Sequence, residues 1–548
     1  MVCGRINAIP GREVIQFMKK SFEKIAFYPF LTAVYPILFL LSVNISEVSP
    51  ETGFRSALIL LIFSLAAFLV ALGITRNIQR SALTSFIVML IFFLLFFVLY
   101  APVYHSLREV QVFGETLGRH RYLMLATLFL LGATELIVIL LSRKLTPKLL
   151  HSVTQVLNLF TLILVLIPTI TITSYTVKKQ QILTRTQANL PPLEQSLKVD
   201  ESNAPDIYYF IFDMHTSDKV MFELMNYDDS DFTAALEERG FFVAPCSRSN
   251  YTSTQFSLTS SLNMNYIQEL TASYETPVLY PLMQYSMVRR ILEDAGYKTY
   301  AFETGYSFTE LKDADRYFSP LAGVMDLLTY PGLTPFESLI MQVSGGKILY
   351  ETRDQLSQKM QFIIDAPYVE YRDRILFTLD TIPALAEEPG PKFVFAHILA
   401  PHDPFVFDEN GSTAMRETPF TMKQDPEYSW DSYRVAYIKE IQYMHKRIIE
   451  IVDELQATSR VPPIIIIQGD HGIPRTEING AHYEIYNAIN LAEDSGKDLY
   501  NTISPVNNFR VIFNNAFGAN FDLLPDEAYI IDQKAGTATQ FTGGFKCP

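Results

Sequence analysis

The chain has 548 residues, of which 49% are hydrophobic, and its mean hydropathy is +0.14. Ordinary soluble enzymes are less apolar than this, so we expect part of the chain to lie in a membrane. The formal net charge of −14 argues against nucleic acid as a partner.

The first third of the sequence carries long apolar runs. Each is close to the roughly 20 residues that a helix needs to cross a bilayer, and none shows the polar face of a buried core helix. We therefore predict a five-span α-helical membrane domain over residues 1–175. The runs are Ile25–Ile45, Ala57–Ile74, Ala82–Ala101, Tyr122–Leu141 and Val153–Ile172.

Basic residues predict how this domain is oriented. Several of them, including Arg12 and Lys24, precede the first run, and Arg76 and Arg80 lie between the second and third. The positive-inside rule then places the N-terminus in the cytoplasm, and five spans deliver the rest of the chain to the outer side. We expect a multi-pass protein of the cell inner (plasma) membrane with a periplasmic or extracellular C-terminal domain.

The composition changes after the last apolar run. Residues 176–204 are polar and contain Pro191-Pro192, and we predict that they form a linker. From residue 205 to 548, apolar strands alternate with amphipathic stretches, which predicts one large α/β domain with a mostly parallel central sheet. The predicted strands are Ile207–Asp213, Thr299–Glu303, Phe393–Leu399, Pro463–Gln468 and Phe509–Asn514, and the clearest predicted helix is Tyr433–Leu455.

Three of these strands lead into polar side chains. They are followed by Asp213, by His402, and by Asp470 with His471. Because the carboxyl ends of parallel strands share one edge of a sheet, we expect these side chains to converge. Carboxylate with imidazole is a ligand set that suits Zn²⁺ or Mn²⁺, with Mg²⁺ or Ca²⁺ as alternatives. His397 alternates within its strand, and we interpret it as packed or hydrogen-bonded.

A segment rich in hydroxyl groups, 247–261, precedes an apolar helical stretch. A hydroxyl at a helix N-terminus faces partial positive charge and free N–H groups, which favours a phosphate or a sulfate there. An ordinary Ser or Thr helix cap is the alternative interpretation of the same residues.

The order of these features resembles the sulfatase-like branch of the alkaline phosphatase superfamily. Its motifs here are Asp213, the hydroxyl-rich helix start, Pro401-His-Asp-Pro-Phe405 and Gly469-Asp-His-Gly472. Apolar spans before such a domain resemble the lipoteichoic acid synthases and phosphoethanolamine transferases. The resemblance implies that Asp213, Asp470 and His471 bind a divalent metal. It also implies that His402 contacts the transferred group and that Thr252 or Thr254 is the nucleophile.

The chain departs from the family pattern at two places. The sulfatase signature is Cys or Ser, any residue, Pro or Ala, any residue, Arg, and Cys246-Ser-Arg-Ser-Asn250 does not match it. This argues against a formylglycine sulfatase. Asp213 stands where the synthases have Glu. The family spacing puts the nucleophile near Tyr251 or Thr252, and Thr252 and Thr254 are both admissible after a small shift.

These observations predict a membrane-anchored, metal-dependent phosphotransferase or phosphodiesterase. Its substrate would be a lipid headgroup or a cell-envelope glycan, and a threonine would carry the phospho-enzyme. The alternatives are a sulfatase-like sulfoester hydrolase and a catalytically silent module for envelope binding or assembly. Only three cysteines are present, and a bridge between Cys246 and Cys547 stays open at this point.

Overall fold

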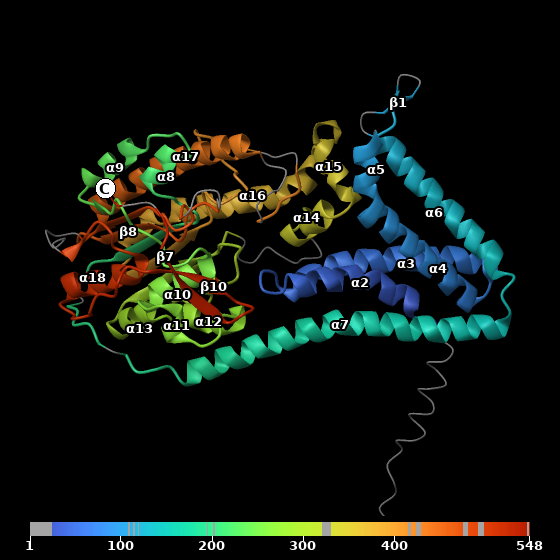
Figure 1. Ribbon diagram of the computed structural model, residues 1–548, viewed down its shortest axis with the longest axis horizontal. Coiled ribbons are helices and arrows are strands. Elements are labelled where there is room, and N and C mark those ends of the chain that lie inside the picture. The colour runs from blue at the N-terminus through green and yellow to red at the C-terminus, as the bar shows by residue number, and fades with distance from the viewer. Residues whose placement is uncertain are drawn as a thin grey trace, which may run out of the picture. The chain divides into compact units, whose positions relative to one another are not determined.

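The computed structural model describes residues 25–544 and 547, with gaps at 108–109, 113–114, 119, 194, 201–202, 321–329, 415–417, 423–428, 475–479 and 492–497. It divides into two compact units (Figure 1). The membrane unit holds the chain up to Ser174 together with Leu333–Ile364, and the catalytic unit holds Tyr175–Gly332 and most of the chain from Asp365 onward. The basic residues before the first apolar run lie outside the described residues.

Helices form at all five apolar runs. Among the described residues, four helices are long and apolar enough to cross a membrane, whereas α2 has only 16 residues, so the predicted count of five spans is not confirmed. The elements are α2 (Tyr28–Val43), η1 (Pro50–Gly53), α3 (Phe54–Thr75), α4 (Ile78–Phe93), the π-helical η2 (Leu94–Leu99), α5 (Tyr100–Leu107), the hairpin β1 (Gln111–Val112) and β2 (Glu115–Thr116), α6 (His120–Ser142) and α7 (Pro147–Ala188).

Helix α7 continues beyond the last predicted span. It reaches Ala188 and so includes the first part of the predicted linker 176–204. The polar composition predicted a linker, but Lys, Gln and Leu, which dominate residues 178–183, are good helix formers, so the helix continues into these residues.

A segment from the later part of the chain also belongs to the membrane unit, which the sequence did not indicate. It contains α14 (Pro335–Gln342), η3 (Gly345–Lys347), α15 (Ile348–Glu351) and η4 (Arg353–Gln355). A capping box starts α14, because Thr334 and Glu337 each accept the other's backbone N–H. The Glu337 carboxylate also accepts from Arg55 of α3, with Nε at 2.7 Å from Oε1. Both side chains are largely buried, so this ion pair holds α14 on the spans.

Replacing Arg55 should loosen this segment. Arg55→Met leaves the Glu337 carboxylate buried without its cation, which costs about 3–5 kcal/mol for a broken buried pair. We expect faster tryptic cleavage after Lys347 and Arg353 in the detergent-solubilised protein. The double variant Arg55→Met/Glu337→Gln should recover most of the protection.

A matched control uses an exposed ion pair. Arg239 pairs with Asp453, whose side chain is 54% exposed, and such pairs contribute about 0–1 kcal/mol. Arg239→Met should leave cleavage of 333–364 unchanged. Equal protection of parent and Arg55→Met would contradict the role of the buried pair.

The catalytic unit contains a seven-stranded sheet in the order β4-β9-β8-β3-β7-β5-β6. Strands β8, β3, β7, β5 and β6 are parallel, and β9 and β4 extend the sheet in antiparallel pairs, so the mostly parallel sheet is confirmed. The strands are β3 (Ile207–Phe212), β4 (Phe242–Val243), β5 (Lys298–Phe302), β6 (Arg316–Phe318), β7 (Lys392–Ile398), β8 (Ile464–Gly469) and β9 (Asn487–Asn490), and a separate hairpin joins β10 (Ala528–Asp532) to β11 (Thr537–Phe541).

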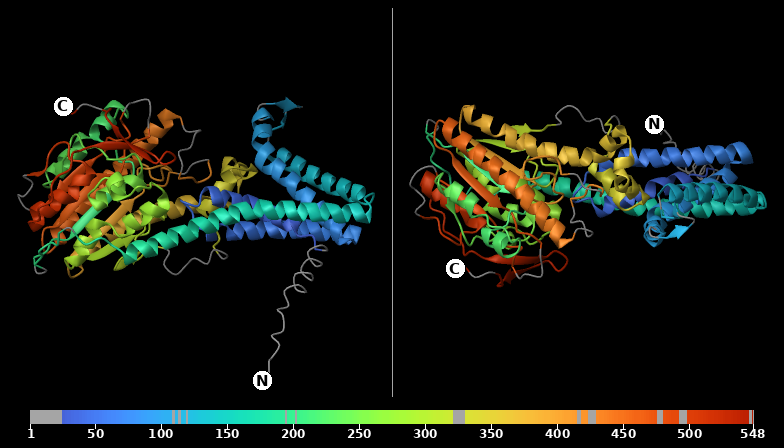
Figure 2. Two further views of the ribbon diagram at one scale, coloured as in Figure 1. Left: turned by 60° about the horizontal axis from the view of Figure 1, so that its bottom comes forward. Right: turned by 90° about the horizontal axis from the view of Figure 1, so that it is seen from above.

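Helices cover both faces of this sheet (Figure 1), and Figure 2 shows the layers from two further directions. Tyr209 of β3 faces one layer, where it meets Phe509 edge to face. On the other face, Tyr437 donates a hydrogen bond to the Met214 carbonyl. The helices are α8 (Asp218–Glu223), α9 (Ser230–Glu237), α10 (Thr254–Asn263), α11 (Ile267–Leu270), α12 (Thr276–Gln284), α13 (Met287–Asp294), α16 (Gln358–Thr381), η5 (Pro383–Glu387), α17 (Trp430–Thr458) and α18 (Pro505–Phe517).

Four of the five predicted strands form, and the predicted helix Tyr433–Leu455 lies inside α17. The fifth strand prediction, Phe509–Asn514, is wrong, because these residues lie in α18. Pro505 occupies the first turn of that helix, and Val506, Phe509 and Phe513 are buried with the three- and four-residue spacing of one helical face. A short apolar run alone does not distinguish the two structures.

Candidate metal centre and nucleophile

Strand register brings the predicted polar side chains together. In the ladder, Phe212 is the partner of both Ile398 and Gly469, so Asp213 and Asp470 follow neighbouring strands at the same level. His397 pairs with Ile211, two residues before Asp213. Because side chains alternate along a strand, His397 and Asp213 lie on the same face of the sheet.

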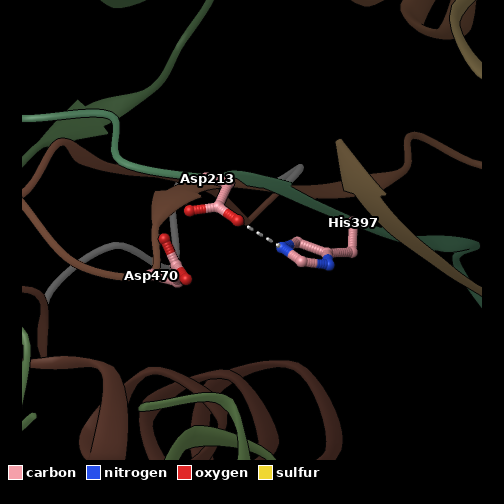
Figure 3. Close-up of side chains that lie close together, drawn as sticks. All are labelled: Asp213, His397 and Asp470. Atoms are coloured by element: carbon pink, nitrogen blue, oxygen red, sulfur yellow. Dashed lines mark ion pairs between the residues drawn. The ribbon is translucent and has the colours of Figure 1, made fainter. Parts of the chain in front are cut away.

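The side chains of Asp213, His397 and Asp470 point toward one another (Figure 3), with ligand atoms all within 4.8 Å. His397 Nε2 lies 3.6 Å from Asp213 Oδ2. His471 Nε2 lies 3.7 Å from Asp213 Oδ1 and 3.6 Å from Asp470 Oδ2. The structure thus brings the three predicted ligands together and adds His397.

Several polar atoms at this centre are buried without a hydrogen-bond partner among the residues that the structure describes. They are Asp213 Oδ1, Asp470 Oδ2 and His397 Nε2. Buried polar atoms normally have partners, and buried charges are normally paired or bound to a metal. Two carboxylates and two imidazoles around one point therefore fit a divalent metal.

Each imidazole is oriented by its other ring nitrogen. Nδ1 of His471 lies 3.0 Å from the Gly472 carbonyl, and Nδ1 of His397 lies 2.9 Å from the Thr309 hydroxyl. A proton on Nδ1 of His471 leaves the Nε2 lone pair directed at the centre, which is the arrangement that metal-ligating histidines use. His397 is hydrogen-bonded, as its sequence pattern indicated. Its place beside Asp213 depends on the register between β3 and β7, which the sequence does not show.

Burial and neighbouring charges shift the two carboxylates in opposite directions. Burial, and then the negative charge of Asp213, raises the pKa of Asp470 above its ordinary value. Burial also acts to raise the pKa of Asp213, but the neighbouring imidazoles, His402 foremost, outweigh it and hold that pKa below its ordinary value. Burial and the charge of Asp213 thus oppose the ionisation of Asp470, and a cation bound at the centre would favour it.

Two further histidines lie near this centre. Burial disfavours the charged form of His402, but Asp213 and then Asp403 outweigh it and raise the pKa of His402. The ring of His482 meets that of His471 edge to face at 5.4 Å, and burial followed by His471 lowers its pKa to about 3. The sequence did not indicate His482, because no strand end or motif marks it.

Of the two predicted nucleophiles, Thr254 faces the centre more directly. Thr254 is the first residue of α10, is 9% exposed, and its hydroxyl interacts with the Asp470 carboxylate, where it acts to lower the pKa of that group. Thr252 lies two residues earlier and is half-buried. Ser257, one turn later, donates to the Asp470 carbonyl at 2.6 Å and ties α10 to the end of β8.

The loop before Thr254 is fastened to the last part of the chain. A disulfide joins Cys246 to Cys547, 301 residues later. Arg248 donates to Glu484 at 2.7 Å and to the Gly543 carbonyl at 3.3 Å. The segment that carries the nucleophile candidates is therefore braced from outside the sheet, and the bridge left open by the sequence is present.

The comparisons with known proteins identify the family. A sequence model described as sulfatase matches residues 226–501, which is just over half of the chain. The chain belongs to the sulfatase family. It is an enzyme of the alkaline phosphatase superfamily, so the resemblance inferred from the strand-end motifs is confirmed. The match begins after Asp213 and includes Thr254, Asp470 and His471. No curated protein matches the sequence.

Solved structures of low identity are also similar. The C-terminal periplasmic domain of EcEptC from Escherichia coli, in complex with Zn, matches at 13% identity and a TM-score of 0.37, covering 60% of this chain and 87% of that chain. The integral membrane protein lipooligosaccharide phosphoethanolamine transferase A (EptA) from Neisseria meningitidis matches at 13% identity and a TM-score of 0.35, covering 88% of this chain and 94% of that chain.

Removing either carboxylate should remove the metal. We expect the purified protein to contain a bound divalent metal, and Asp213→Asn and Asp470→Asn to lose it, because each supplies a buried anionic ligand. Metal content after extensive dialysis is the measurement. The control is Asp218→Asn, since Asp218 accepts from Thr233 on a different part of the fold. Equal metal content in all four proteins would contradict the assignment.

Removing the disulfide should destabilise the catalytic unit. A native bridge that closes a long loop typically contributes about 2–4 kcal/mol. We expect Cys246→Ser/Cys547→Ser to unfold at lower denaturant and to lose hydrogen-exchange protection in residues 246–256. Cys3→Ser is the matched control. Identical unfolding midpoints for parent and double variant would show that the bridge is dispensable.

Proposed function

We propose that this protein is a membrane-anchored, metal-dependent phosphotransferase or phosphodiesterase that uses Thr254 as its nucleophile. The observation that carries the proposal is the meeting of unpartnered carboxylate oxygens of Asp213 and Asp470 with a hydroxyl at the start of α10. A nucleophile beside paired carboxylates suits the attack of an alkoxide on a phosphate ester.

The ligands of the metal would be Asp213, Asp470 and His471, with His397 as a fourth. When bound, a divalent metal supplies positive charge that lowers the hydroxyl pKa and offsets charge on the phosphoryl oxygens. Zn²⁺ or Mn²⁺ suits the two imidazoles better than Mg²⁺ or Ca²⁺ does.

The chain's own residues account for the group transfer. Thr254 Oγ1 loses its proton to solvent and forms a bond to phosphorus, and the bond from phosphorus to the leaving oxygen breaks. His402, with its raised pKa, donates a proton to that leaving oxygen. In the second half, the neutral His402 takes the proton of an alcohol or water whose oxygen bonds to phosphorus, the bond from phosphorus to Thr254 Oγ1 breaks, and a solvent proton restores the threonine hydroxyl. The N-terminus of α10 favours the negative charge of the bound group throughout.

Two alternatives fit less well. A formylglycine sulfatase needs a modifiable Cys or Ser, but Cys246 is bonded to Cys547 and the first residue of α10 is Thr254. A sulfoester hydrolase with an unmodified hydroxyl remains as the second candidate function. A silent envelope-binding module would have no need for two uncompensated buried carboxylates, which destabilise the fold unless they are used.

The substrate and compartment follow from the membrane unit. We propose an inner-membrane location with the N-terminus in the cytoplasm and the catalytic unit on the periplasmic or extracellular side. Anchoring through apolar helices suits a phosphoester that is itself held in the membrane or the envelope, such as a lipid headgroup or a lipid-linked glycan.

Thr254→Ala should abolish turnover. We expect kcat for a soluble phosphodiester, bis(p-nitrophenyl) phosphate, to fall by a factor on the order of 10³ or more, because no other group forms the covalent intermediate. Metal content should stay near that of the parent. Mass spectrometry of acid-quenched parent enzyme should find phosphate on the peptide that contains Thr254.

The same substitution two residues earlier is the control. Thr252→Ala should keep most of the activity. If Thr252→Ala loses as much activity as Thr254→Ala, or if neither does, Thr254 is not the nucleophile. Turnover of p-nitrophenyl sulfate in preference to the phosphodiester would instead favour the sulfoester hydrolase.

A further inference from the structure

A cavity of about 770 Å³ lies inside the membrane unit. Its walls come from α2, from α4 with the π-helical η2, and from α7, and Ile340 of α14 and Val343, which directly follows that helix, complete them. All of these residues belong to the membrane unit, so the cavity is a feature of that unit alone. π-Helical turns are rare and occur frequently at functional sites.

The wall of this cavity is apolar. Most of the lining side chains are Leu, Ile, Val and Phe, and the two threonines that line it have used their hydroxyls. Thr32 donates to the Tyr28 carbonyl at 2.8 Å, and Thr161 donates to the Leu157 carbonyl at 2.9 Å. A water molecule needs two to four polar partners to be held in a protein, so water is a poor occupant of this space.

The rim of the cavity is continuous with the outer apolar surface of the spans. Leu90, Val98 and Phe160 line the cavity, and yet they are 44%, 58% and 52% exposed. These residues lie on helices that are long and apolar enough to cross a membrane. In a bilayer this surface is covered by hydrocarbon chains, so the cavity opens onto hydrocarbon and not onto water.

We propose that this cavity binds an acyl chain of a glycerophospholipid. The acyl chain enters from the bilayer past Leu90 and Val98 and lies against Thr32 and Phe86, which are each only 7% exposed. A lipid bound here fits a substrate of the lipid class better than a glycan, and this substrate role rests on the proposed function. The binding of an acyl chain does not itself rest on the proposed function, because it involves only residues of the membrane unit.

The segment 333–364 connects this cavity to the catalytic unit along the chain. Ile340 and Val343 line the cavity, and the same polypeptide continues into α16, whose residues from Asp365 onward belong to the catalytic unit. The buried pair of Glu337 and Arg55 fixes α14 in place over the spans.

Photolabelling with a lipid probe tests the proposal. The full-length Thr254→Ala protein is reconstituted in phosphatidylethanolamine–phosphatidylglycerol vesicles that contain a phosphatidylethanolamine with a diazirine in mid-chain, and labelled residues are mapped by mass spectrometry. We expect labels on Thr32 and Phe86, which bulk lipid does not reach. Leu90→Trp and Leu164→Trp, which narrow the cavity from α4 and α7, should each lose these labels.

The matched control is Leu128→Trp, because Leu128 lies on α6 outside the cavity and is 58% exposed. It should keep the labels on Thr32 and Phe86. Labels confined to exposed residues such as Leu128, or labels on Thr32 and Phe86 that survive both narrowing variants, would overturn the proposal. Two narrowing variants on different helices are used so that one misfolded protein does not decide the result.

Activity separates this inference from the proposed function. In the active enzyme, Leu164→Trp should raise KM for a vesicle-embedded phosphatidylethanolamine and leave kcat/KM for bis(p-nitrophenyl) phosphate unchanged. Loss of labels in Leu164→Trp with no phosphoester turnover in the parent would support chain binding and reject the proposed function. Equal KM values for the lipid in Leu164→Trp and Leu128→Trp would reject the substrate role of the cavity.

Discussion

Two carboxylates held next to each other out of water dominate the catalytic unit. Asp213 is 4% exposed and Asp470 is fully buried, and one oxygen of each has no hydrogen-bond partner among the described residues. Such a pair repels itself and gives up its hydration, so the fold tolerates it only because something supplies positive charge. The central position of β3 between β7 and β8 imposes this arrangement, since it places the ends of two neighbouring strands at one level.

The nearby histidines are arranged around the same constraint. His397 and His471 each have Nδ1 occupied by a protein group, which leaves both Nε2 atoms near the Asp213 carboxylate. His402 tends toward the cationic form because of the same carboxylate. The centre therefore holds negative charge on its carboxylates next to positive charge on His402.

Sequence reasoning was most successful where residues are buried on both faces. Strands such as Ile464–Gly469 read as unbroken apolar runs, and their last residues locate Asp213, Asp470 and His471. It was less successful where tertiary packing decides the outcome. Phe509–Asn514 is apolar in either structure, and α18 forms because its face packs on the sheet.

The structure of the membrane unit could also be predicted only in part from the sequence. The apolar runs predicted the helices, but the length of α2 and the continuation of α7 to Ala188 depend on local helix propensity and packing. Nothing in the composition of 333–364 separates it from the catalytic unit. Its place among the spans depends on pairing between Arg55 and Glu337, which are 282 residues apart.

The long separation of Cys246 and Cys547 affects the order in which the protein is assembled. Chains are made at about 5–20 residues per second, so the 301 residues between the two cysteines take about 15–60 s to synthesise. During that interval the loop before Thr254 lacks both its disulfide and the Gly543 carbonyl that accepts from Arg248. The segment that leads to Thr254 can therefore gain these two restraints only after the last residues of the chain have been made. Because the sequence has three cysteines, few incorrect disulfides are open to Cys246 before Cys547 is synthesised.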